Sequence, residues 1–161
     1  MKTTNRRIPQ LTLSLALLMV STCSWSGSGT PTEYKELFRL PLNQQEQRFR
    51  QFPLEKQVDI YVRAMYVEPP LTRYATYVAS NGKEVLPFLL ARLESEKSDT
   101  AKAHLFYAFT VVHERYYSLT NENSTLRSLE SVTTNMSDQY RKNQCEQYLR
   151  TIRESPGFGV R

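Results

Sequence analysis

Two histidines, His104 and His113, are the first candidates for chemistry because the chain contains no others. They are nine positions apart, and on one helix this spacing places them about half a turn out of phase, so they cannot share a metal ion. Glu114 follows His113, but the second histidine of a zinc-binding HExxH motif is missing. We therefore expect His113 at the surface or its boundary, and we expect no metal site and no cofactor.

Other residue types that support catalysis lack the required pattern. The sequence contains no GxSxG nucleophile elbow, no GxxxxGK[ST] phosphate loop and no GxGxxG dinucleotide motif. Glu94 and Glu96 are two positions apart at the end of a predicted helix, so they point in different directions and fit a solvated turn better than a catalytic pair. These observations favour a protein that is not an enzyme.

Aromatic side chains provide a different kind of candidate site. Tyrosine has an apolar ring and a polar tip, which favours it at interfaces and at sugar-binding surfaces. Four tyrosines crowd one predicted hairpin, and further aromatic residues lie on a later helix. The possible binding surface consists of Tyr61, Tyr66, Tyr74, Tyr77, Phe106 and Tyr117. A helix that is buried on two faces would also explain Phe106, so both interpretations stay open.

The N-terminus has the layout of a secretory signal peptide. Lys2, Arg6 and Arg7 precede an apolar run from Leu11 to Val20, and small residues follow it. About ten apolar residues are too few to cross a bilayer as a helix, which needs roughly 20. The run has no polar face, which argues against an amphipathic first helix. We therefore predict export, with residues 1–22 as the signal peptide.

The stretch Val20-Ser21-Thr22-Cys23 resembles the lipobox of bacterial lipoproteins. The resemblance implies that Cys23 is lipidated and becomes the first residue of the mature protein. Ser24 after it resembles the outer-membrane sorting class, which implies the periplasmic side of the outer membrane. Ordinary signal-peptidase cleavage remains the alternative, and it would give a soluble periplasmic or secreted protein. Residues 23–32 are small, polar and glycine-rich, which is typical of a flexible tether.

Charge, size and cysteine content further limit the class of protein that the sequence fits. The net charge of +5 falls to +2 without the three basic residues of the signal, and no Lys or Arg run remains, so we expect no nucleic-acid partner. The 139 residues from Cys23 onward suit one domain with a real core. Cys145 falls at helical spacing with Leu149 and Ile152, which favours a buried thiol over a reactive one.

Hydrophobic spacing predicts an all-α fold. Apolar stripes of helical period run through residues 54–65, 71–78, 86–93 and 101–116, with Pro53 at the first helical position of the first stripe. Ser98 or Asp99 can cap the fourth helix. A long helix follows from Leu126 to Ile152, and residues 133–135 are poor helix formers that bend or break it. We expect a single helical domain over residues 33–155 and a loose tail over residues 156–161.

Consecutive amphipathic helices with short connections pack as antiparallel hairpins. The stretch from Gly82 to Phe109 resembles a HEAT repeat, on the basis of Pro87 within its first helix, the leucine stripe that follows, and Asp99 with Lys102 after the turn. The resemblance implies a short HEAT-like α-solenoid, in which the acidic and basic pair joins neighbouring turns. A compact helical bundle is the alternative arrangement of the same hairpins.

Two functional hypotheses follow. The first is a non-catalytic, lipid-anchored protein of the cell envelope whose helical surface binds a protein partner, since stacked hairpins form extended binding surfaces. The second is an envelope enzyme, or a binder of glycans or small ligands, with an unrecognised site. A deep pocket that holds a perturbed glutamate beside tyrosines would favour the second.

Overall fold

The structure is a computed structural model that describes residues 31–159, and this part of the chain is all-α. It contains eight α-helices and one short 3₁₀ helix, η1 (Gly82–Val85), and no strand occurs within the described residues. The all-α expectation is therefore confirmed. The helices are α1 (Thr32–Arg39), α2 (Leu42–Phe49), α3 (Leu54–Ala64), α4 (Arg73–Ala79), α5 (Leu86–Ser95), α6 (Asp99–Arg115), α7 (Asn123–Thr134) and α8 (Gln139–Glu154).

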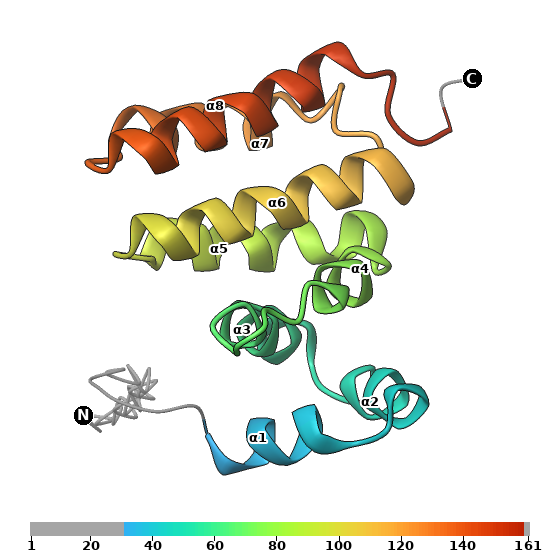
Figure 1. The fold of residues 1–161 in the computed structure, drawn as a ribbon. Helices are drawn as coiled ribbons and strands as arrows, with labels where there is room; N and C mark the ends of the chain where they lie inside the picture. The colour runs from blue at the N-terminus through green and yellow to red at the C-terminus, as the bar shows by residue number, and fades with distance from the viewer. Residues whose placement is uncertain (1–30, 160–161) are drawn as a thin grey trace, which may run out of the picture.

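The eight helices form a compact bundle of four successive pairs, which Figure 1 shows one above another from the N-terminal to the C-terminal end. Alternate helices contact each other along the bundle, α3 with α5 and α5 with α7 on one side, and α4 with α6 and α6 with α8 on the other. The most extensive of these helix–helix contacts joins α6 to α8. The bundle therefore has two layers, of which α4, α6 and α8 form one.

Helix boundaries follow local chemistry. Pro53 lies just before α3, at the capping position, rather than inside the helix as we expected. Ser98 caps α6, and its side-chain oxygen accepts a hydrogen bond from the backbone N–H of Ala101 at 3.3 Å. Asp138 caps α8 in the same way with the N–H of Arg141, at 3.1 Å. Gly82 has φ +58°, a conformation that favours glycine, where the chain turns from α4 into η1.

The predicted long helix over residues 126–152 is two helices. Residues 135–138 interrupt it, at the position where the sequence predicted a bend or break. Thr134 Oγ1 and Asn135 Nδ2 each donate a hydrogen bond to a backbone carbonyl of α7, at 2.9 Å. Polar side chains thus bond to backbone groups of the last turn of α7, and the chain then reverses into α8.

The first helix was not predicted, because its apolar signal is short. Only Tyr34 and Leu37 of α1 are buried. The helix is held by the rest of the bundle through Gln45, a buried residue of α2. Its amide nitrogen donates to the carbonyl of Leu40 at 2.6 Å, and its amide oxygen accepts from the Tyr74 hydroxyl at 3.1 Å. Tertiary contacts therefore stabilise a helix that its own sequence specifies weakly.

One core of buried side chains runs through the whole bundle, with contributions from α1 to α8. Cys145 lies in this core, with Leu149 and Ile152 on the same face of α8, so its predicted burial is confirmed. Tyr140 is four positions after the buried Met136 within the predicted long helix, but 72% of its surface is exposed. The break before α8 rotates the start of this helix and removes Tyr140 from the stripe that Leu126 and Leu129 define.

Candidate functional site

The structure places half of the predicted aromatic surface in the core. Tyr61, Tyr74 and Phe106 are completely buried. The Tyr61 hydroxyl donates a hydrogen bond to the backbone carbonyl of His104 at 2.5 Å, so its polar tip is satisfied inside the protein. For Phe106, the interpretation as a residue of a helix buried on two faces is the correct one. These three side chains have no surface to offer a ligand.

The other three predicted residues lie in separate surroundings. Tyr66 is 56% exposed, and its ring meets that of His104 edge-on with centroids 5.7 Å apart. Tyr77 is half-buried against Phe49 and Tyr74. Tyr117 is half-buried, and its hydroxyl donates to Glu122 at 2.5 Å. The structure therefore does not gather the six predicted residues into one surface.

Tyr66, in the turn after α3, instead contacts a row of half-exposed side chains along α6 and α8. We call this row together with Tyr66 the α6–α8 face, and it consists of Tyr66, His104, Tyr107, Arg141, Gln144 and Tyr148. The rings of Tyr107 and Tyr148 lie side by side, with centroids 6.1 Å apart, and so join the two helices. Aromatic residues beside an arginine are the side chains most often found at the energetic centre of protein interfaces.

Hydrogen bonds order the α8 side of this face. The Arg141 guanidinium donates from Nη1 to Gln144 Oε1 at 3.0 Å, and Gln144 Nε2 donates to the Tyr148 hydroxyl at 3.2 Å. Burial is the main cause that raises the pKa of Tyr148, so its hydroxyl stays protonated and can still donate. Burial, and then the charge of Arg141, lowers the pKa of His104. The imidazole of His104 is therefore mostly neutral at pH 7.

Sequence reasoning named Tyr66 but missed the rest of this face, because the other five residues lie on secondary stripes of α6 and α8. His104 and Tyr107 are three positions apart on α6, and Arg141, Gln144 and Tyr148 are three and four positions apart on α8. Both spacings place side chains on one helix face. The pairing of the two stripes depends on how α6 packs against α8, which neither helix alone specifies.

Asp99 connects two successive pairs of helices at one end of this face. One carboxylate oxygen accepts from Lys102 Nζ at 2.9 Å. The other accepts from the backbone N–H and the hydroxyl of Ser137, at 2.8 and 2.9 Å, and from the N–H of Asp138 at 2.8 Å. These bonds, with that of Asp138 the strongest cause, hold the pKa of Asp99 well below its usual range. Asp99 therefore fixes the start of α8 against the start of α6.

A second group of polar residues lies where the chain leaves α8, and it includes a histidine whose position we did not expect. His113 is completely buried rather than at the surface. Its Nδ1 accepts from the N–H of Leu119 at 3.0 Å, and its Nε2 contacts the Ser155 hydroxyl at 2.8 Å. Since Nδ1 accepts, the proton of the neutral ring lies on Nε2. Burial is the main cause that lowers the pKa of His113.

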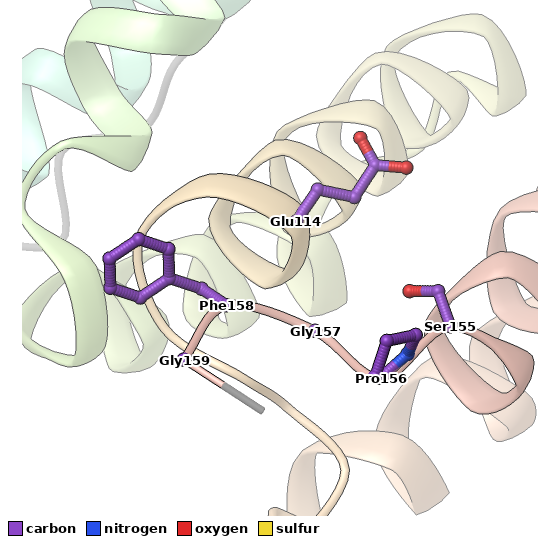
Figure 2. A pocket seen from close by; sticks show the side chains of 6 residues that line it. All are labelled: Glu114, Ser155, Pro156, Gly157, Phe158 and Gly159. Atoms are coloured by element: carbon purple, nitrogen blue, oxygen red, sulfur yellow. The ribbon is translucent and has the colours of Figure 1, made fainter. Parts of the chain in front are cut away.

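The segment after α8 is held in place over its described part, residues 155–159, although we expected a loose tail. The N–H of Phe158 donates to the carbonyl of His113 at 2.8 Å. Gly157 has φ +70°, and a Cβ there would lie 2.5 Å from Ser118 Oγ. Figure 2 shows this segment leaving α8 beside Glu114 of α6. Together they border an open hollow of about 500 Å³.

Asp59 of α3 is a buried acidic residue. It is only 9% exposed, and neither carboxylate oxygen has a hydrogen bond of ordinary distance and angle. Burial raises the pKa of Asp59, and this effect outweighs the lowering by the nearby Tyr34 hydroxyl and by the charges of Arg63 and Arg92. These neighbours come from α1, α3 and α5, so Asp59 is a titratable group at the junction of three helices.

Some predictions fall on residues that the structure does not describe. The signal peptide, the lipidation site Cys23 and most of the tether precede residue 31. Within residues 31–159, no group of three or more His, Cys, Asp or Glu side chains could hold a metal ion. In the same part of the chain, no helix combines the length and the apolar character needed to cross a bilayer.

Comparison with protein-family models, with curated proteins and with solved structures found no match. The proposals below therefore depend on the residues of this chain and on their arrangement in the fold.

Proposed function

We propose that this protein is a non-catalytic lipoprotein of the cell envelope that binds a protein partner through its α6–α8 face. The lipobox-like stretch at Cys23 and the glycine-rich residues 23–32 support this proposal, because a lipidated Cys23 with a flexible tether would hold the folded domain near a membrane, on the periplasmic side of the outer membrane. The arrangement of the helix pairs supports a HEAT-like interpretation, because alternate helices stack in two layers and Asp99 connects neighbouring pairs.

The single observation that carries the proposal is the half-exposed row on α6 and α8. Tyr107 and Tyr148 are only half-buried and their rings lie together, and Gln144 links Arg141 to Tyr148 by hydrogen bonds. A partner that covers these rings gains roughly 25 cal/mol for each Å² of apolar surface removed from water. Tyrosine and arginine lose little conformational freedom per contact, since hydrogen bonds already order Arg141 and Tyr148.

Site-specific photo-crosslinking in the native host tests this function. Tyr107 is replaced by a photoreactive phenylalanine, and Phe88, which is 38% exposed on α5 in the other layer, serves as the matched control position. We expect one defined crosslinked protein from position 107, lost when Tyr148 is changed to Ala, and no such product from position 88. Equal products from both positions, or no product from position 107, would contradict the proposed function.

Membrane attachment is tested separately at Cys23. We expect the intact mass of the mature protein to include acyl chains, and the Cys23→Ala variant to lose both the chains and its membrane fraction. An unmodified N-terminus beyond Cys23 would instead indicate ordinary cleavage and a soluble periplasmic or secreted protein.

The alternative function, an envelope enzyme or a binder of glycans or small ligands, has less support. A deep pocket with a perturbed glutamate beside tyrosines would favour it. The hollow at the end of α8 contains Glu114, but the rest of its lining comes from residues 155–159, which include no tyrosine. Binding of cell-wall glycan fragments to the purified domain, measured by calorimetry, would favour this alternative.

A further inference from the structure

Arg141 has an arrangement that helix stability does not explain. It is the third residue of α8 after the cap Asp138, in the first turn of the helix. A positive charge in the first turn opposes the helix dipole, at a cost of about 0.3–1 kcal/mol. None of the ion pairs between described residues includes Arg141. Its contacts are the amide of Gln144 and the ring of Tyr140, whose centroid is 5.2 Å away.

The Arg141 guanidinium has no carboxylate as an ion-pair partner among the described residues. After burial, the charge of Arg141 is a further cause that lowers the pKa of His104. At Cys145, burial is the main cause that raises the thiol pKa, and the charges of Asp99 and Glu146 oppose the effect of Arg141 on it. The Asp138 carboxylate accepts from the backbone N–H of Arg141 at 3.1 Å, and Asp99 accepts from Lys102, Ser137 and Asp138. Among the described residues, neither carboxylate forms an ion pair with the guanidinium. A guanidinium has five N–H donors, and the structure uses one of them on Gln144. The centre of the α6–α8 face therefore offers guanidinium donors that no carboxylate of the described residues pairs with.

We propose that the protein segment bound at the α6–α8 face carries an Asp or Glu side chain whose carboxylate pairs with Arg141, while an adjacent apolar side chain packs on Tyr107 and Tyr148. This inference rests on the proposed function and names the chemistry of the partner. The carboxylate accepts hydrogen bonds from the guanidinium and from the Tyr148 O–H. The Tyr148 oxygen accepts from Gln144 Nε2, so the Tyr148 O–H remains available to donate. It also offsets the helix dipole, so partner binding removes the cost of placing Arg141 in the first turn.

Charge reversal at Arg141 tests this partner chemistry in the crosslinking assay at position 107. Glutamate at position 141 stands three residues after the cap Asp138, as in a capping box, so the Arg141→Glu variant should keep a stable α8. Arg150→Glu, an exposed position on the same helix, is the matched control for the change in net charge. We expect Arg141→Glu to lower the crosslinked yield at least tenfold, Arg141→Lys to lower it less, and Arg150→Glu to leave it unchanged.

The outcomes separate the inference from the function on which it rests. If position 107 gives its specific product and Arg141→Glu reduces it no more than Arg150→Glu, the carboxylate inference is overturned and the proposed function stands. If position 107 gives no specific product in the unmodified background, the function itself fails and the inference fails with it. Unchanged far-ultraviolet circular dichroism in all variants shows that the loss is not a folding defect.

A second measurement examines the purified domain and the source of the carboxylate. The probe is a tetraglutamate peptide, with tetraglutamine as the control and acetate at equal carboxylate concentration as the free-anion arm. We expect tetraglutamate to raise the pKa of His104, followed by nuclear magnetic resonance, because it offsets the nearby charge of Arg141, and we expect no such rise in Arg141→Gln. An equal rise with acetate would mean that the site takes any small carboxylate, which would overturn the assignment to a protein segment.

Discussion

Asp99 provides the sharpest test of how the helix pairs are held together, and the informative change is Asp99→Asn. The carboxylate accepts from Lys102 Nζ through one oxygen, and from Ser137 and the N–H of Asp138 through the other. Its side chain is 10% exposed, so solvent cannot replace these bonds easily. Asparagine has nearly the same shape, but it has one acceptor oxygen instead of two and carries no charge.

The expected cost follows from the number of bonds affected. Hydrogen bonds to charged groups contribute roughly 1.5–3 kcal/mol each, and neutral ones about half as much. The variant loses the bond to Lys102 or weakens those to residues 137 and 138, depending on how its amide is oriented. We therefore expect the free energy of unfolding to fall by about 2–4 kcal/mol, a large part of the roughly 5–15 kcal/mol available to a domain of this size.

The contribution of Asp99 to the free energy of unfolding should depend on pH. The pKa of Asp99 is held well below its usual range in the folded protein, mainly by the N–H of Asp138 and by Lys102. In the unfolded chain the pKa is about 3.9. The contribution of the charge is therefore fully present above about pH 4 and declines by roughly 1.4 kcal/mol per pH unit below it. Asp99→Asn has no titrating group at this position. The loss in free energy of unfolding relative to the unmodified protein should therefore be about 1 kcal/mol smaller near pH 3 than near pH 7.

Urea unfolding followed by circular dichroism at both pH values measures these differences. Asp138→Asn is the control, because it also removes one negative charge near α8, while asparagine caps a helix about as well as aspartate. The reasoning is refuted if Asp99→Asn costs no more than Asp138→Asn, or if its deficit is the same near pH 3 as near pH 7.

Four further predictions concern the segment after α8 and three buried side chains. Gly157→Ala should detach the segment after α8 and speed hydrogen exchange of the Phe158 amide about tenfold or more, because the new Cβ meets neighbouring side chains and φ is +70°. The lowered pKa of His113 means that its stabilising contribution is present above about pH 6.5 and is lost as pH falls, so the same amide should lose protection in mild acid. The raised pKa of Asp59 has the opposite sign, since its contribution is lost as pH rises, and Asp59→Asn should raise the melting temperature near pH 7 but not in acid. Burial raises the pKa of Cys145 to about 12, so a thiol reagent should label it at least a hundredfold faster in the unfolded than in the native protein, and equal rates would contradict its burial.

The sequence alone was sufficient for the fold class and for most helices. Apolar stripes of helical period marked α3 to α6, and the polar residues of 133–135 marked the break between α7 and α8. Ser98 was recognisable as a cap because its hydroxyl can satisfy a free N–H of the first turn within three residues. Burial of Cys145 was also predictable, since its position on the stripe of α8 is a local property.

Only the tertiary structure decided which side chains form a surface. Tyr61, Phe106 and Tyr107 are all aromatic residues within predicted helices. They differ in whether neighbouring helices cover them, since Tyr61 and Phe106 are buried and Tyr107 is half-buried. The same holds for His113, which lies on the apolar stripe of α6 and is buried because the chain returns to it at Ser155, 42 positions later. A stripe specifies a face of one helix, but the helices that meet that face are set by packing of the whole chain. The α6–α8 face exists for this reason, and no local pattern could specify it.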